Sequence, residues 1–135
     1  MQNFSRTFLW IIRIGIFLLL FTPLVVTHSL FFPYITGKNF FFRIIVEIIF
    51  GVWLALAMFD RGFRPKKSPL LLMLVLFFTI MTLATLFSVE PYYSFWSNFE
   101  RMEGLITHLH VLALFLVLGH VLRGEKEWFY FINAS

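Results

Sequence analysis

Apolar residues fall in four long blocks separated by short polar stretches. The blocks cover residues 8–26, 40–59, 70–87 and 105–122, and each comes close to the roughly 20 residues that a helix needs to cross a bilayer core. They lack the period-two alternation of membrane strands, and a helix satisfies its backbone hydrogen bonds internally within lipid. The pattern predicts an all-α, polytopic membrane protein in which residues 1–135 form one transmembrane unit of four transmembrane helices.

Basic residues mark which loops should face the cytoplasm. They precede the first block, fill the stretch between the second and third, and follow the fourth: Arg6; Arg61, Arg64, Lys66 and Lys67; Arg123 and Lys126. Lys38 and Arg101 are the clear basic residues of the other two loops. The positive-inside rule therefore predicts a multi-pass protein with a cytoplasmic N-terminus. Arg13, inside the first block, is interpreted as an anchor that reaches back to the inner membrane surface.

Composition narrows the class of protein further. The 135 residues are 60% hydrophobic and 13% charged, with a formal net charge of +4. Because the basic residues are split among short loops, they report topology and do not form a nucleic-acid surface. The lipid bilayer is the expected partner. The chain has no cysteine, which excludes disulfides and thiolate metal sites.

The second outer loop contains a run of aromatic residues. Phe95, Phe99 and Met102 follow helical spacing, and Trp96 adjoins them. We expect a short interfacial helix here, with its aromatic side in the membrane surface.

Positive charge in the outer loops has two interpretations. Lys38, Arg43 and Arg101 could bind a phosphate or diphosphate head group, because arginine matches phosphate oxygens in bidentate fashion. Alternatively, Arg101 forms surface ion pairs with Glu100 and Glu103 that hold the loop in place.

The second block carries an acid within the membrane. Glu47 lies one helical turn after Arg43, at a depth where a lone carboxylate is costly. It is a candidate proton or substrate contact; the alternative is a structural Arg43–Glu47 ion pair facing the bundle. On the same block, Gly51 and Ala55 form a small-xxx-small pair that would let a neighbouring helix approach.

The histidines do not predict a metal site. His108 and His110 point about 200° apart on a helix, and His120 points in a third direction, so one ion cannot bind all three. The chain also has no glycine-rich phosphate loop and no nucleophile elbow. We expect neither a metal nor another cofactor.

Two stretches carry a resemblance to a known family. The run at 32–48, FPYITGKNFFFRIIVEI, and the run at 94–105, SFWSNFERMEGL, resemble the N-terminal part of bacterial O-antigen ligase and polymerase family proteins. Their separation by one helix, a basic turn and another helix is also similar to that family, and the resemblance covers most of residues 32–128.

The resemblance implies a glycosyltransferase of the bacterial inner membrane. Such proteins move a glycan from undecaprenyl diphosphate to an acceptor on the periplasmic face, and the fold does not fix whether the acceptor is lipid A core, another glycan or a protein. The family's catalytic arginine and histidine lie in a large periplasmic loop further along the chain, so no catalytic residue is carried over here. Residues 1–135 are expected to be the N-terminal part of a longer protein, inactive without its remaining helices.

Within the resembling runs, Lys38, Arg43 and Arg101 are expected contacts for the carrier diphosphate, and Glu47 is an intramembrane polar residue. Two other functions stay open. One is a small four-helix membrane scaffold or accessory subunit without catalytic activity. The other is a transporter fragment that uses Glu47 as a proton site.

Overall fold

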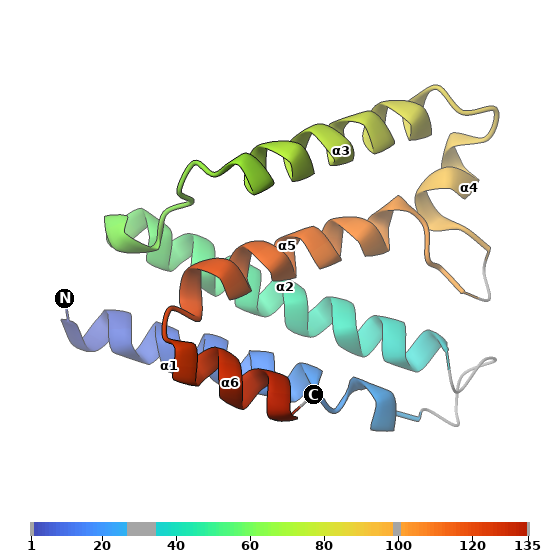
Figure 1. Ribbon diagram of the computed structural model, residues 1–135. Helices are drawn as coiled ribbons and strands as arrows, with labels where there is room; N and C mark the ends of the chain where they lie inside the picture. Colours follow the sequence, from blue (N-terminus) through green and yellow to red (C-terminus); the bar gives the residue numbers. More distant parts are fainter. Residues whose placement is uncertain (1, 27–34, 99–100, 135) are drawn as a thin grey trace.

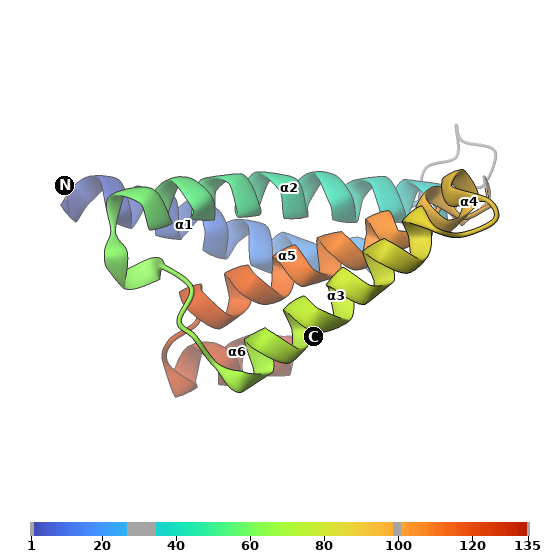
Figure 2. The same ribbon diagram turned by 90° about the horizontal axis from the view of Figure 1, so that it is seen from above.

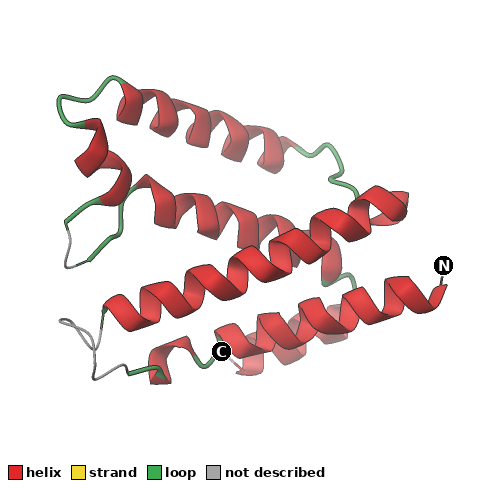
Figure 3. Cartoon of the chain, turned by 180° about the vertical axis from the view of Figure 1, so that it is seen from behind, coloured by secondary structure: helices red, strands yellow, loops and turns green. Residues whose placement is uncertain are grey.

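The computed structural model describes residues 2–26, 35–98 and 101–134, with the side chains of residues 2–4 left aside. Its α-helices are α1 (Gln2–Leu19), α2 (Thr36–Phe59), α3 (Pro69–Leu86), α4 (Pro91–Trp96), α5 (Leu105–Val121) and α6 (Glu125–Ala134). Two short 3-10 turns, η1 (Thr22–Leu24) and η2 (Arg61–Phe63), follow α1 and α2. Every regular element in these ranges is helical, which confirms the all-α prediction (Figure 3).

Three helices, α1, α2 and α5, run side by side between two ends of a bundle (Figure 1). One end, here called the N-terminal end, holds the start of α1, residues 60–68 and the turn between α5 and α6. The opposite end, called the α4 end, holds α4 and the starts of α2 and α5. The stretches that the positive-inside rule assigned to one side of a membrane therefore lie together at the N-terminal end.

Two helices are long and apolar enough to cross a membrane. They are α2, with 24 residues and a mean hydropathy of 2.2, and α3, with 18 residues and a mean hydropathy of 2.4. The apolar helix α5 has 17 residues. Length and composition thus favour membrane association through two helices, where the sequence predicted four spans.

The core of the bundle is built from one face of each central helix. It joins Ile12 and Ile16 of α1, Ile49, Trp53 and Leu56 of α2, and Val117 and Val121 of α5, with Phe63 of η2 closing the N-terminal end. In contrast, α3 has no buried residue and diverges from α2 toward the N-terminal end (Figure 2). Its apolar side chains, such as Leu72 and Met73, face outward, as expected for a helix surrounded by lipid.

The helix boundaries differ from the predicted ones where turn chemistry intervenes. The first helix begins at Gln2 and ends at Leu19, not at residue 26, since Pro23 lacks the N–H that would continue it. The Thr22 hydroxyl donates to the Leu19 carbonyl at 2.6 Å and so satisfies one of the last carbonyls of α1. At the start of α3, Ser68 accepts from the Leu71 N–H at 3.1 Å, and Pro69 occupies the first turn.

Helix α6 turns back from the end of α5 and is tied to α1. Glu127 accepts from the N–H groups of Arg123 and Gly124 at the start of α6, and it also pairs with Arg13. Arg13 therefore bonds to a carboxylate of this chain, and its role as an anchor at the inner membrane surface stays a prediction.

The close approach of α1 and α2 involves Gly15, not the predicted Gly51–Ala55 pair. A Cβ at Gly15 would lie 2.2 Å from Cγ2 of Ile49, whereas a Cβ at Gly51 would have no heavy atom within 4 Å in the described part of the chain. Gly15 thus allows α1 and α2 to pack closely, and Gly51 lies on the exposed side of α2.

Candidate functional site

Five polar side chains lie along the interface between α2 and α5 near the α4 end. Asn39, Arg43 and Glu47 come from successive turns of α2, and Thr107 and His110 come from the first two turns of α5. The two helices run in the same direction, so partners that are further along α2 are also further along α5 (Figure 1). We call these five residues the polar seam.

Arg43 is the most buried charge of the seam, with 6% of its surface exposed. Its Nη2 donates to the carbonyl oxygen of Met102 and to the hydroxyl of Thr107, the latter at 2.7 Å. Thr107 in turn donates to the Met102 carbonyl at 3.1 Å. Arg43 therefore joins α2, the start of α5 and the loop that precedes α5.

Glu47 attracts Arg43 electrostatically, but the two side chains form no direct ion pair in the described part of the chain. Arg43 bonds to Met102 and Thr107, while the Glu47 carboxylate meets His110 instead. The two α2 side chains lie one turn apart, but polar groups on α5 lie opposite both of them. Each α2 residue consequently bonds across the helix interface.

The loop at 97–104 is held to α2 by its carbonyl groups. Asn39 donates to the carbonyl of Arg101, one residue before the carbonyl that Arg43 binds. The N–H groups of Arg101 and Met102 both turn back to the carbonyl of Asn98. Consecutive carbonyls of this loop are thus fixed by two side chains spaced one helical turn apart.

The predicted interfacial helix does not continue to Met102. The helix in this region, α4, ends at Trp96, and the next residue, Ser97, has φ of 65°. Met102 also adopts a positive φ, of 51°, which is incompatible with a continued helix. Phe99 lies outside the described residues. A short helix is present in this loop, but it covers Pro91–Trp96 and ends at the positive φ of Ser97, so of the three residues in the predicted spacing only Phe95 lies in it.

Gly104 explains how tightly the loop packs. A Cβ at this position would lie 2.2 Å from the carbonyl oxygen of Phe95 and 2.8 Å from the backbone nitrogen of Trp96. The start of α5 therefore rests directly against the backbone at the end of α4, and only glycine allows that approach.

Glu47 and His110 form a pair across the interface between α2 and α5. His110 Nδ1 lies 2.7 Å from the Ile106 carbonyl, so we assign a hydrogen to Nδ1. His110 Nε2 lies 3.0 Å from Oε1 of Glu47, and this contact is attractive only with a second proton, on Nε2 or on the carboxyl group. In either arrangement the pair is neutral overall, which lowers the cost of an acid in an apolar helix.

The two members of this pair are unequally covered. The side chain of His110 is 10% exposed, and that of Glu47 is 68% exposed. The carboxyl group thus reaches the outer surface of this bundle, where lipid, another helix or a ligand could meet it.

The other two predicted diphosphate contacts lie at the α4 end. Lys38 is half-buried at the start of α2, and the Arg101 side chain is exposed in the loop before α5. Glu100 and Glu103 were the predicted ion-pair partners of Arg101. Glu103 is close enough to attract Arg43 electrostatically. Glu100 lies outside the described residues. A phosphate contact by these residues stays a prediction.

Histidines occupy three separate environments. Nδ1 of His108 lies 3.1 Å from the Gly104 carbonyl, His110 belongs to the seam, and His120 lies near the N-terminal end. Within residues 2–26, 35–98 and 101–134, no group of three or more histidine or acidic side chains is placed to hold a metal ion.

Sequence reasoning missed Thr107 and Asn39 and gave His110 only a packing role. A signal was present: Arg43 and Glu47 are four residues apart on one apolar helix, and Thr107 and His110 are three apart on another. Both spacings place polar groups on one helix face, and two polar faces in apolar helices favour each other as partners.

Comparison of the chain with protein-family models, with curated proteins and with solved structures finds no match. The resemblance to O-antigen ligases and polymerases stays a prediction that rests on the two sequence runs. The class of protein that the fold defines is an all-helical chain with two candidate membrane-spanning helices.

Proposed function

We propose that this chain is the N-terminal membrane segment of an O-antigen ligase-like glycosyltransferase in the bacterial inner membrane. In this proposal the α4 end faces the periplasm, and α1 and α5 cross the membrane together with α2 and α3. The whole protein transfers a glycan from undecaprenyl diphosphate to an acceptor, and its catalytic groups come from parts of the protein beyond this segment.

One observation carries the proposal: the two runs that resemble the family meet in space. Asn39 and Arg43 belong to the first run, and the carbonyls that they bind belong to Arg101 and Met102 of the second. The bonded residues are far apart in the sequence, since the Arg43–Met102 bond spans 59 positions. This contact gives the two runs one structural role in common, which supports interpreting them as parts of a single family pattern.

The geometry divides the predicted contacts into two roles. Arg43 is buried and bonded to the loop, so it positions the loop and the side chains that the loop presents. Lys38 and Arg101 keep solvent or headgroup access and supply the positive charge for a diphosphate. Glu47 contributes to the pair with His110.

The test is glycan transfer in membranes that contain the natural gene product. We expect Arg101→Ala to lower transfer about tenfold, the equivalent of one charge-assisted contact to a diphosphate. Arg61→Ala, which removes the same charge from the N-terminal end, is the matched control and should leave transfer unchanged. Full activity of Arg101→Ala would show that Arg101 does not contact the diphosphate.

The accessory-subunit alternative gains support from a specific observation, the 68% exposure of the Glu47 side chain on a candidate membrane helix. A partner helix that donates to Glu47 would cover it. Mass measurement of the natural polypeptide distinguishes the two functions: further helices and a large loop in the same polypeptide favour the glycosyltransferase, and a separate partner favours the accessory subunit.

A further inference from the structure

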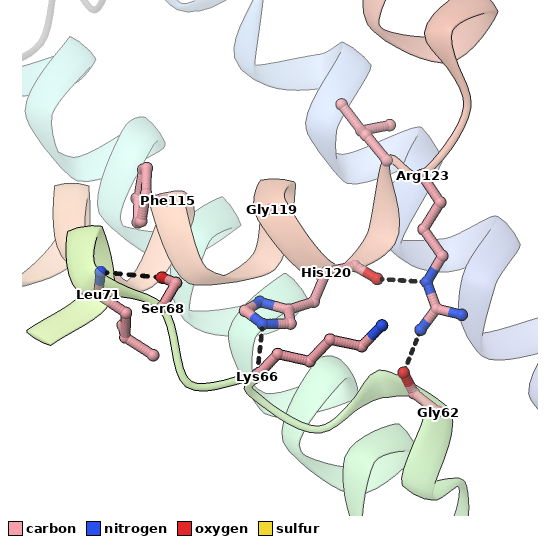
Figure 4. Close-up of a pocket in the computed structure, with 9 residues that line it drawn as sticks. Gly62, Lys66, Ser68, Leu71, Phe115, Gly119, His120 and Arg123 are labelled. Atoms are coloured by element: carbon pink, nitrogen blue, oxygen red, sulfur yellow. Dashed lines mark hydrogen bonds between the residues drawn. The ribbon is translucent and has the colours of Figure 1, made fainter.

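A polar cavity of about 530 Å³ lies at the N-terminal end, between the loop at 60–68 and the end of α5 (Figure 4). Its polar lining comes from Lys66, Ser68, His120 and Arg123, and its apolar lining includes Leu71 and Phe115. None of these residues belongs to the polar seam.

Two cations converge on this cavity. Figure 4 shows the Lys66 ammonium group between the ring of His120 and the guanidinium of Arg123. The cavity lining contains no acid. Two acids lie near Arg123 in the described part. Glu127 is engaged with Arg13 and with the backbone at the start of α6, and the Asp60 carboxylate accepts from the Gly62 N–H. Lys66 and Arg123 thus both bring positive charge to the cavity lining, and positive charge attracts an anion.

The surrounding bonds hold the cavity open while leaving donors available. Arg123 donates to the carbonyls of Gly62 and His120, and its guanidinium lies 4.0 Å from the centre of the Phe63 ring. His120 Nε2 accepts from the backbone N–H of Lys66 at 3.3 Å, which fixes the loop beneath the cavity. The Lys66 ammonium therefore faces the cavity from an anchored backbone.

Ser68 supplies a second donor. Its oxygen accepts from the Leu71 N–H at 3.1 Å, and a hydroxyl that accepts one bond still has its own hydrogen to donate. An ammonium group and a hydroxyl that face one space match the oxygens of a phosphate.

An apolar groove continues from this cavity along α3. Ser68 and Leu71 line both the cavity and a neighbouring hollow of about 660 Å³ that extends to Val75. Val75 also lines the next hollow, of about 330 Å³, which reaches Leu83 of α3 and Leu112 of α5. From Leu71 to Leu83 the helix rises about 18 Å, close to the depth of one leaflet of a bilayer core about 30 Å thick.

We propose that this cavity and groove bind one anionic phospholipid of the leaflet at the N-terminal end. The phosphate lies against Lys66 and Ser68, and one acyl chain follows α3 past Val75. Charge complementarity selects an anionic head group, and the apolar groove selects a lipid over free phosphate. The inference depends on membrane placement and is independent of the glycosyltransferase proposal, because it concerns the opposite end of the bundle.

The test is native mass spectrometry of the purified chain in nonionic detergent, titrated with phosphatidylglycerol or with phosphatidylcholine of the same acyl chains. We expect one phosphatidylglycerol to bind about tenfold more tightly than phosphatidylcholine, a difference of about 1.4 kcal/mol. Lys66→Gln should abolish this preference. Lys126→Gln, which removes the same charge from an exposed position outside the cavity, should retain it.

A second variant tests the groove separately from the charge. Val75→Trp fills the hollow that continues the cavity and should weaken binding of both lipids about tenfold while leaving the cations in place.

Three results would overturn the proposal. They are equal affinities for the two lipids, equal loss of preference in Lys66→Gln and Lys126→Gln, and saturation by inorganic phosphate that displaces phosphatidylglycerol. A dimer mass that appears in place of the lipid-bound monomer would instead assign the groove to a second copy of the chain. Because the readout is lipid mass and not glycan transfer, its failure leaves the proposed glycosyltransferase function untouched.

Discussion

The two ends of the bundle differ in how their positively charged side chains are placed. At the α4 end, Arg43 is almost fully covered and bonds to Met102 and Thr107 of the same chain. At the N-terminal end, Lys66 is exposed and shares an open cavity with Arg123. A cation whose donors bond to its own chain fixes the fold, and a cation that faces a cavity remains available for a ligand.

The same contrast appears in the two glycines at the ends of α5. A Cβ at Gly104 would collide with the backbone of α4, whereas a Cβ at Gly119 would have nothing within 4 Å in the described part of the chain. Gly119 lines the cavity beside Lys66 and Arg123. Packing is therefore tight where the chain bonds to itself and loose where we infer a lipid.

The largest effect should come from Arg43→Ala. The change removes two charge-assisted hydrogen bonds and leaves a gap between α2 and α5, so we expect a loss of about 3 kcal/mol in the free energy of unfolding. Unfolding of the purified chain in mixed micelles, followed by far-UV circular dichroism, measures it. Lys38→Ala, on the same helix, is the control and should cost less than about 1 kcal/mol. Equal losses in the two variants would contradict the structural role of Arg43.

Gly104→Ala should have the next largest effect, a loss of about 2 kcal/mol, because the new methyl group must push the end of α4 away from α5. Hydrogen exchange of residues 91–96 should accelerate in this variant. Gly119→Ala should instead be neutral or stabilise the chain by up to about 1 kcal/mol, since alanine favours a helix and space is available. Destabilisation by Gly119→Ala would mean that the N-terminal end is as tightly packed as the α4 end.

A smaller effect should appear in the coupling between Glu47 and His110. In a double-mutant cycle with Glu47→Ala and His110→Ala, we expect an interaction free energy of about 1 kcal/mol, because each single change leaves the other side chain without its 3.0 Å partner. Thr107→Ala combined with Glu47→Ala provides the reference, since the structure shows no bond between those two residues. Additive single effects in the Glu47–His110 cycle would show that the two side chains do not stabilise each other.

The smallest effect on stability should come from Lys66→Gln, less than about 0.5 kcal/mol by the same unfolding measurement. The ammonium group is exposed, so the fold loses little when it is removed. A loss as large as that of Arg43→Ala would show that Lys66 holds the loop at 60–68 in place, and the contrast between the two ends would disappear.

The sequence by itself determined the helical class and most helix positions. The apolar block at 70–87 became α3 at Pro69–Leu86, and that at 105–122 became α5 at Leu105–Val121, because backbone hydrogen bonding and local turn residues act over only a few positions. The cluster of basic stretches at one end also followed from the sequence, since alternating helix directions bring every second loop together.

Only the tertiary structure decided which polar groups meet. An Arg43–Glu47 ion pair was one of the two interpretations of the sequence, but the register of α2 against α5 gives these residues Thr107 and His110 as partners. The short helix ended at Trp96, and Asn39 and Arg43, about 60 positions earlier, bind the carbonyls of Arg101 and Met102 in the loop that follows it. The cavity at Lys66 likewise needs the end of α5 beside the loop at 60–68. Periodicity along one helix carries no information about the register between two helices, which depends on the side chains at every contact.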